Sequence, residues 1–124
     1  MSATRESLKF RYSILKWYYS VFVRNDEVGA VFRPLFFDFP QDENLYDLDS
    51  QFLIGTEIMA APILYPNQTS REVYFPGGVK WFDFINCSKV KSFNFIEIAT
   101  RNNILFFFSH ISPCKENHLK LKIL

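Results

Sequence analysis

The side chains best suited to chemistry in this sequence are a few carboxylates. Asp38 follows an apolar run, whereas Asp47 and Asp49 lie two residues apart in a polar segment. Paired carboxylates can act as nucleophile and general acid/base, and clustered ones can hold a divalent cation. Asp38 has no second carboxylate set in a motif, and the other pair lacks further oxygen ligands and a loop glycine. We expect a cap or an ion pair with Arg33 for Asp38 and turn caps for the others, and no catalytic, substrate-binding or metal-binding residue.

The histidines, cysteines and glycines add no further site. His110 and His118 lack a serine or cysteine motif that they could activate, so incidental surface roles are expected. Cys87 and Cys114 are too few and too far apart for a disulfide scaffold or a zinc site, which favours two unpaired thiols. The 4 glycines form no phosphate-binding loop. No cofactor and no metal is expected.

Length and charge limit the classes of protein to consider. The 124 residues fit one domain of about 100–150 residues. With 14 basic and 13 acidic residues the net charge is +1, without the basic excess of nucleic-acid or anionic-membrane binders. The 15 phenylalanines carry more large apolar surface than so short a domain can hide. We therefore expect this excess apolar surface to contact a partner, or to have lost one.

Targeting signals are weak. The first residues are polar, and no apolar core of a signal peptide follows before Lys9 and Arg11. The longest apolar run, 104–108, is far shorter than the roughly 18–20 residues of a membrane span, so no membrane partner is expected. Asn67 and Asn86 each begin an N-glycosylation triplet, which makes them acceptor candidates in a secretory compartment and turn residues otherwise.

Residues 5–22 have the periodicity of an amphipathic helix. Apolar side chains step by four and three along one side: Leu8, Tyr12, Leu15, Tyr19 and Phe22. Ile14, Trp17, Tyr18 and Val21 widen that side. We therefore expect burial over most of the circumference, with neighbours on two sides. The helix should end between Arg24 and Gly29, where Asn25-Asp26 and the glycine favour termination.

A buried strand is predicted over 31–39. The segment is β-branched, aromatic or aliphatic almost throughout and is closed by Pro40. Such continuous hydrophobicity is typical of a parallel strand covered on both faces, and a preceding buried helix fits a βα unit. Pro34 cannot donate a backbone hydrogen bond, which places it near the start of the strand or at a distortion. Residues 41–50 then form a polar loop with one helical turn at most.

Short apolar runs between turn residues follow Gln51 and are typical of an all-β region. The runs are 52–55, 58–64, 72–75 and 81–85. Pro76-Gly77-Gly78 predicts a hairpin that joins the last two as an antiparallel pair. Weaker strand patterns occupy 93–98 and 104–108, and 115–124 fits an edge strand or a loose tail equally well.

Several sequence words occur in an order that carries a resemblance. They are RYSIL at 11–15, RPLFFDFPQD at 33–42, YDLDSQFLIG at 46–55, APIL at 61–64, VYFPGG at 73–78 and WFD at 81–83. In this order they resemble glycoside hydrolase family 31, which includes lysosomal, intestinal and endoplasmic-reticulum α-glucosidases. The resemblance spans about residues 5–86, and the shared order of the motifs makes it specific.

The resemblance implies a large enzyme with a (β/α)₈ barrel followed by β-sandwich domains. Residues 1–50 would be the C-terminal segment of the catalytic barrel, 51–88 the start of the proximal β-sandwich domain, and 89–124 a divergent or irregular tail. The expected fold class is thus α/β plus all-β: the last helix and strand of a barrel, then part of an antiparallel β-sandwich. Surfaces made to face the rest of a barrel would also explain the aromatic excess.

The resemblance places the chemistry of the family outside this chain. A retaining α-glucosidase needs two carboxylates about 5–5.5 Å apart; in the family both aspartates, and the Arg and His that bind the sugar, lie on earlier barrel strands. We expect a fragment that hydrolyses no O-glycosyl bond alone, with an α-linked glucoside as the substrate of the parent only and the missing barrel portion as a partner. Six residues are predicted to be structural at the junction: Arg33, Asp38, Asp49, Gln51, Trp81 and Asp83.

Two departures from the family pattern lead to further expectations. Lys16 occupies a helix position where the family usually has proline, and nothing after Asn86 resembles the glycine- and arginine-rich segment of the family. The second departure predicts that this end is divergent or out of frame. The family is mostly secretory (endoplasmic reticulum, lysosome or extracellular), although this sequence shows no signal peptide. The alternative function is a noncatalytic module that binds a protein or a glycan through exposed aromatic side chains.

Overall fold

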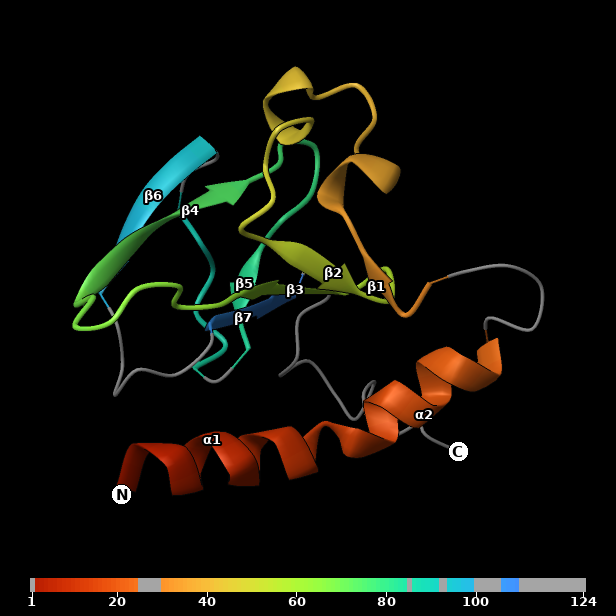
Figure 1. Ribbon diagram of the computed structural model, residues 1–124. Helices are drawn as coiled ribbons and strands as arrows, with labels where there is room; N and C mark the ends of the chain where they lie inside the picture. Colours follow the sequence, from red (N-terminus) through yellow and green to blue (C-terminus); the bar gives the residue numbers. More distant parts are fainter. Residues whose placement is uncertain (1, 25–29, 85, 92–93, 100–105, 110–124) are drawn as a thin grey trace.

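The fold has three layers, with a five-stranded sheet between two helices and a two-stranded ribbon (Figure 1). A computed structural model describes residues 2–24, 30–84, 86–91, 94–99 and 106–109. Every strand pair in this part of the chain is antiparallel. The architecture is therefore that of a small β domain with few helices.

The predicted amphipathic helix is present but broken in two. α1 spans Ser2–Ser13 and α2 spans Leu15–Arg24, with Ile14 between them. The Ile14 amide donates to the Phe10 carbonyl (3.2 Å), and the Trp17 amide donates to the Ile14 carbonyl (2.9 Å). The second bond spans three residues, as in a 3-10 turn, and tightens the backbone where the helices meet. The two helices follow each other below the sheet with a slight bend (Figure 1).

Only one side of these helices is buried. Ile14, Trp17 and Val21 pack against apolar side chains of the sheet. The stripe predicted to lie on the buried side is exposed instead: Leu8, Tyr12, Leu15, Tyr19 and Phe22. Both sides have helical hydrophobic spacing, but the sheet covers only one of them. Burial over most of the circumference is therefore a wrong prediction for the described side chains.

The strand predicted over 31–39 is mostly absent. β1 contains only Phe32–Arg33 and pairs antiparallel with β2, Phe52–Ile54. Pro34 ends β1, because proline has no amide hydrogen to donate, and Leu35–Phe37 turn into the 3-10 helix η1. A second 3-10 helix, η2, spans Glu43–Leu45 in the predicted polar loop. The long parallel strand is thus a wrong prediction, and its hydrophobic residues form a turn.

The central sheet has the strand order β1-β2-β3-β7-β5. β3 is Ile58–Ala61, β7 is Phe106–Ser109 and β5 is Phe82–Asp83. Alternate residues of β3 belong to different cores: Ile58 and Ala60 pack with the helices, whereas Met59 and Ala61 pack on the opposite face. Because both faces of the sheet are covered, all of β3 is buried.

The ribbon pairs β4, Ser70–Phe75, with β6, Asn94–Ala99. The hairpin predicted between 72–75 and 81–85 is therefore wrong, since β5 lies in the other sheet. Gly78 does adopt a positive φ of 86°, which a glycine accepts without strain. The turn then leads into the core, where Trp81 Nε1 donates to the Pro76 carbonyl (3.0 Å).

The two weak strand patterns late in the sequence are confirmed. β6 and β7 overlap the predicted segments 93–98 and 104–108. Residues 115–124, for which an edge strand and a loose tail were both open, lie outside the described part of the chain.

Two smaller points concern the cysteines and the helices. Cys87 is disulfide-bonded, so the unpaired thiol predicted at that position is wrong; Cys114 lies outside the described residues. In the part of the chain that the structure describes, no helix is both long enough and apolar enough to span a membrane.

Candidate functional site

A surface depression of about 370 Å³ brings two carboxylates to one place. It lies where the chain leaving η1 meets the turn that follows β4. Its lining consists of Asp38, Phe39, Pro40, Gln41, Asp42, Pro76 and Gly77. Acid/base chemistry needs one carboxylate that is free and one that holds a proton. The partners of Asp38 and Asp42 therefore decide what the depression can do.

Asp38 forms an ion pair with Arg33. Both side chains are largely buried, with 18% of Arg33 and 23% of Asp38 exposed. The turn η1 brings them together, because the Asp38 amide donates to the Leu35 carbonyl (3.2 Å) and folds the chain back towards β1. Asp38 Oδ2 and Arg33 Nε are buried without a hydrogen-bond partner in the described part of the chain. A carboxylate paired in this way is poorly placed to attack a substrate.

Asp42 accepts hydrogen bonds on both oxygens and caps η2. Tyr74 Oη donates to Oδ2 (2.6 Å), and the amide and side chain of Asn44 donate to Oδ1 (3.2 and 2.9 Å). Desolvation would raise the pKa of Asp42, but the bonds from Tyr74 and Asn44 outweigh it and lower that pKa. Burial and the bond to Asp42 raise the pKa of Tyr74, so its phenol remains a donor. Asp42 is thus an ionised acceptor and not a proton donor.

Gln51 is buried and joins the central sheet to the ribbon. Its Oε1 accepts from the Tyr74 amide (2.7 Å), and its Nε2 donates to the Tyr74 carbonyl (2.9 Å) and to Met59 Sδ (3.2 Å). Gln51 immediately precedes β2, whereas Tyr74 lies on β4. The side-chain amide therefore satisfies both backbone hydrogen-bonding groups of Tyr74, as the backbone of a paired strand would.

Three further residues predicted to be structural have different surroundings. Trp81 is buried in the core between the sheets. Asp83 lies on β5, and its Oδ1 accepts from the Asn86 amide (3.0 Å). Asp49 is exposed and forms no side-chain hydrogen bond or ion pair with the described residues. Of the six residues, Arg33 and Asp38 form an ion pair with each other, and the junction role of all six remains a prediction.

Close packing fixes α2 to the sheet. Trp17 and Val21 are buried there, and the Arg24 guanidinium lies over the Trp17 ring, 5.5 Å from its centroid. Gly55, with φ of 65°, permits the contact, because an added Cβ would lie only 3.0 Å from Val21 Cγ2. The bare glycine thus lets helix and sheet approach each other.

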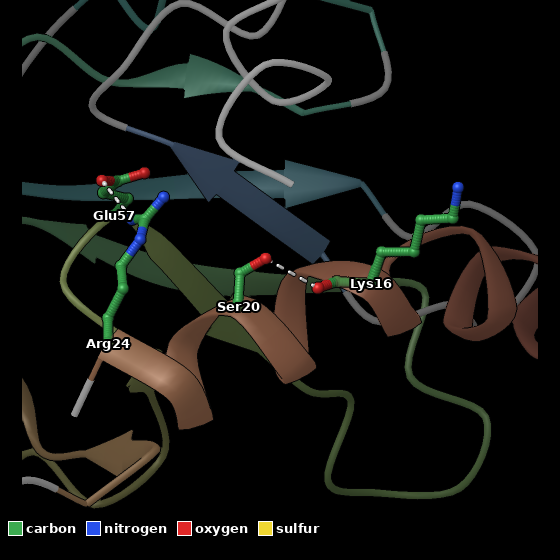
Figure 2. Close-up of polar contacts among 4 residues, drawn as sticks. All are labelled: Lys16, Ser20, Arg24 and Glu57. Atoms are coloured by element: carbon green, nitrogen blue, oxygen red, sulfur yellow. Dashed lines mark hydrogen bonds and ion pairs between the residues drawn. The ribbon is translucent and has the colours of Figure 1, made fainter. Parts of the chain in front are cut away.

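The polar side of α2 carries a row of side chains four residues apart. Figure 2 shows Lys16, Ser20 and Arg24 in this row, with Arg24 directed at Glu57 and the Lys16 ammonium directed away from it. Arg24 Nη1 lies 3.8 Å from Glu57 Oε1, and Ser20 Oγ donates to the Lys16 carbonyl (3.0 Å). Arg24 therefore ties the helix to the sheet, whereas Lys16 extends into solvent.

Comparison with known proteins decides the family. The model of the glycosyl hydrolase family 31 C-terminal domain matches residues 29–110, about two thirds of the chain. The chain belongs to glycosyl hydrolase family 31. It is 43% identical over 81 residues to alpha-glucosidase 2 of Bacillus thermoamyloliquefaciens, covering 64% of this chain. It is 37% identical over 109 residues to the lysosomal acid alpha-glucosidase of Tetrahymena pyriformis, covering 83% of this chain.

Solved family 31 enzymes contain a region with the same fold. A Flavobacterium johnsoniae dextranase complexed with glucose superimposes with a TM-score of 0.78 at 28% identity, over 87% of this chain and 13% of the dextranase. An alpha-xylosidase from a soil metagenome, complexed with xylose, gives a TM-score of 0.80 over 99% of this chain and 18% of that enzyme. At 22% identity, the second likeness concerns the fold alone.

The chain is short beside these family 31 relatives. It spans 10% of the Bacillus enzyme and 12% of the Tetrahymena enzyme. The family match reaches residue 110, further than the motifs at 5–86. Activities, substrates and partners of the whole relatives therefore belong to those proteins.

The remaining candidate positions form no site among the described residues. No group of three or more His, Cys, Asp or Glu side chains there could hold a metal ion, and Asp47 is exposed. Asn67 and Asn86 are exposed, so both stay candidates for N-glycosylation. His110 and His118 lie outside the described part of the chain.

The sequence interpretation missed Arg71 and Tyr74. Arg71 is buried and donates to the carbonyls of Pro62, Ser50 and Glu72, and burial lowers the pKa of its guanidinium. Its position two residues before Val73 on β4 could have placed it on the inward face. No pattern in the sequence connects Tyr74 to Asp42, because 32 residues separate them.

Asp42→Asn is expected to lower the Tm at neutral pH and to lose this effect in acid. The pKa of Asp42 is lowered in the folded chain, so its ionised form stabilises the fold above the unfolded value of about 3.9. That contribution disappears as the pH falls through the lower, folded pKa. Thermal melts followed by circular dichroism should show the Tm difference at about pH 7 and its loss in stronger acid, below about pH 3. The exposed Asp47→Asn is the control, and an equal difference at both pH values would contradict the assignment.

Proposed function

We propose that this chain is the part of a retaining α-glucosidase that joins its catalytic barrel to the β-domain behind it, and that it is not catalytic by itself. Residues 1–50 would be the C-terminal segment of a (β/α)₈ catalytic barrel. Residues 51–88 begin the proximal β-sandwich domain, and 89–124 follow as a divergent or irregular tail, of which the family match still includes the part up to residue 110. The identity to two α-glucosidases over a small share of their length supports this proposal.

The state of the two carboxylates in the depression is the observation that carries the proposal. Retaining hydrolysis needs a free nucleophile and a carboxylic acid whose pKa is raised, about 5–5.5 Å apart. Asp38 is instead paired with Arg33, and the pKa of Asp42 is lowered. Asp42 therefore does not have the raised pKa of a general acid, and Asp38 is occupied by Arg33, whereas both environments suit residues that hold a turn in place.

The substrate of the parent enzyme is, on this proposal, an α-linked glucoside. The relatives are named alpha-glucosidases, and solved family members were obtained with glucose or xylose bound. The rest of the barrel would supply the catalytic aspartates and the sugar-binding residues. Within this chain Arg33, Asp38, Gln51 and Trp81 would keep barrel and β-domain in register.

The test is hydrolysis of an aryl α-glucoside by the purified chain, compared with Asp38→Asn and Asp49→Asn. The expected result is no release of aglycone above the buffer blank for all three, while a full-length family 31 α-glucosidase is active in the same assay. Asp49 is an exposed carboxylate outside the depression and controls for loss of charge alone. Hydrolysis that Asp49→Asn keeps and Asp38→Asn loses would overturn the proposal.

A noncatalytic binding module is the second candidate function. The exposed aromatic side chains of the helices favour it, since Tyr12, Tyr19 and Phe22 are 71%, 65% and 62% exposed. A cooperative and reversible melting transition of the soluble chain would support this candidate. Irreversible aggregation, or co-purification with an upstream α-glucosidase fragment, would support the severed junction instead.

A further inference from the structure

An apolar stripe runs along the side of α1 and α2 that faces away from the sheet. Its members are Leu8, Tyr12, Leu15, Tyr19 and Phe22, all exposed. Their steps of four and three residues place them on one side of the helices, roughly opposite Ile14, Trp17 and Val21. A contiguous exposed stripe of this kind marks an interaction surface.

The stripe is bordered by cations. Residues 2–24 contain five basic residues and one acidic residue. Lys9, Arg11 and Lys16 are exposed next to members of the stripe, and none of them forms an ion pair with the described residues. Figure 2 shows the Lys16 ammonium pointing away from the only carboxylate near α2 in that view, which Arg24 binds. The fitting partner surface is therefore acidic and partly apolar.

The same chain presents such a surface at its other end. Residues 35–58 contain six acidic residues and no lysine or arginine. Three of the six have partners: Asp38 pairs with Arg33, Asp42 accepts a hydrogen bond from Tyr74, and Glu57 pairs with Arg24. Glu43, Asp47 and Asp49 stay exposed, with no side-chain partner among the described residues, around the exposed ring of Tyr46. We call these three carboxylates and Tyr46 the acidic loop.

The acidic loop and the cationic stripe lie on opposite sides of the molecule. In Figure 1 the gold and yellow segment that contains η2 lies at the top, and the red and orange helices lie at the bottom with the sheets between them. One copy cannot bring the two surfaces together. Two stripes cannot pair with each other either, because Lys9, Arg11 and Lys16 would meet the same cations.

We propose that the chain associates head to tail, with the cationic stripe of one copy docked on the acidic loop of the next. The three cations face Glu43, Asp47 and Asp49, and the apolar stripe packs on Tyr46. The contact joins different surfaces of two copies, so it propagates into short open arrays and does not close as a dimer. The net charge of +1 leaves little overall repulsion to oppose it. The inference goes beyond the proposed function: it concerns this chain separated from the rest of the barrel, which on that proposal would cover the helix surface in the parent enzyme.

Sedimentation velocity over a series of concentrations is the first measurement. At about 20 mM salt the mean mass of the wild-type chain should rise with concentration, and about 0.5 M salt should weaken association about tenfold or more, because exposed charges are screened. A chain that stays monomeric at every concentration would overturn the proposal. Association that is insensitive to salt would overturn it too, because that result would point to apolar aggregation alone.

Charge reversal identifies the surfaces. The triple variant K9E/R11E/K16E should weaken association about 100-fold or more, since attraction becomes repulsion at each position. The matched control K80E/K89E/K91E reverses three exposed lysines outside both surfaces, changes the net charge equally, and should associate more strongly than the helix variant. Circular dichroism checks that each variant is folded. Equal effects of the two triple variants would overturn the proposal.

Restoration of association separates a specific contact from a folding defect. E43K/D47K/D49K alone should lose association, and its combination with K9E/R11E/K16E should regain it, because the charges are then complementary in the reversed sense. Failure of the folded sixfold variant to associate would overturn the proposal. So would a monomeric wild type whose stripe binds vesicles of phosphatidylserine, since a membrane surface would then be the occupant.

Discussion

Replacing Trp81 by alanine is expected to lower the free energy of unfolding by about 3–5 kcal/mol, the range found for large aromatic residues removed from a core. Trp81 is 1% exposed. Its ring centroid lies 6.2 Å from those of both Phe39 and Phe75, and its Nε1 donates to the Pro76 carbonyl (3.0 Å). The substitution removes packing against the loop after η1 and against β4, and it takes the hydrogen bond from the buried Pro76 carbonyl.

A conservative variant separates these two contributions. Trp81→Phe keeps most of the apolar volume and loses the hydrogen bond, so about 1–3 kcal/mol should be lost. Urea unfolding followed by far-ultraviolet circular dichroism measures both variants, since fluorescence would change with the tryptophan itself. Tyr65→Ala, at a side chain 70% exposed, is the control and should cost less than about 0.5 kcal/mol. A cost of Trp81→Ala close to that of the control would contradict the core assignment.

The positions of the strands could be predicted from the sequence more easily than the pairing between them. The segments that became β6 and β7 were predicted from local alternation, because that pattern reflects the two faces of each strand. The prediction of a hairpin at Pro76-Gly77-Gly78 is wrong because turn residues indicate only that the chain turns there, and not which strand pairs with which. β4 instead pairs with β6, where Phe75 lies opposite Asn94. Such a distant pairing leaves no local signal in one sequence.

Continuous hydrophobicity also predicted the wrong strand direction. It was interpreted at 31–39 as a parallel strand covered on both faces. The structure shows full burial at β3, Ile58–Ala61, within an antiparallel sheet. Here α2 covers one face and the core beneath the ribbon covers the other. Burial on both faces therefore depends on the layers around a sheet and not on the direction of its strands.

The candidate site was predictable only where family motifs marked it. Asp38 and Arg33 stand five residues apart in one motif, and the turn at Pro34 brings them together. Asp42 and Tyr74 come from different layers, so their hydrogen bond depends on the packing of the whole fold. No motif marks Arg71, although it is buried and binds backbone carbonyls from two other segments.

Gln51 gives the second large effect, because it pairs with both backbone groups of Tyr74. Gln51→Leu fits a similar volume but leaves a buried amide and a buried carbonyl unpaired. At about 1–3 kcal/mol for each group, the free energy of unfolding should fall by about 2–6 kcal/mol. Gln41→Leu, at an exposed glutamine, is the matched control and should cost less than about 0.5 kcal/mol. Equal costs in urea unfolding would contradict the pairing.

Gln51→Glu distinguishes lost hydrogen bonds from lost volume. The glutamate can still accept from the Tyr74 amide but, when ionised, cannot donate to the Tyr74 carbonyl. Burial without a cation raises the pKa of such a carboxyl above its unfolded value of about 4.3, so ionisation destabilises the folded chain at neutral pH. As the pH falls through that raised value, the protonated acid becomes a donor again and its deficit relative to wild type should shrink. The leucine variant has no such group, so its deficit should change less between about pH 7 and pH 5. A deficit of the glutamate variant that does not shrink in acid would place the effect in packing volume instead of in the two hydrogen bonds that link the sheets.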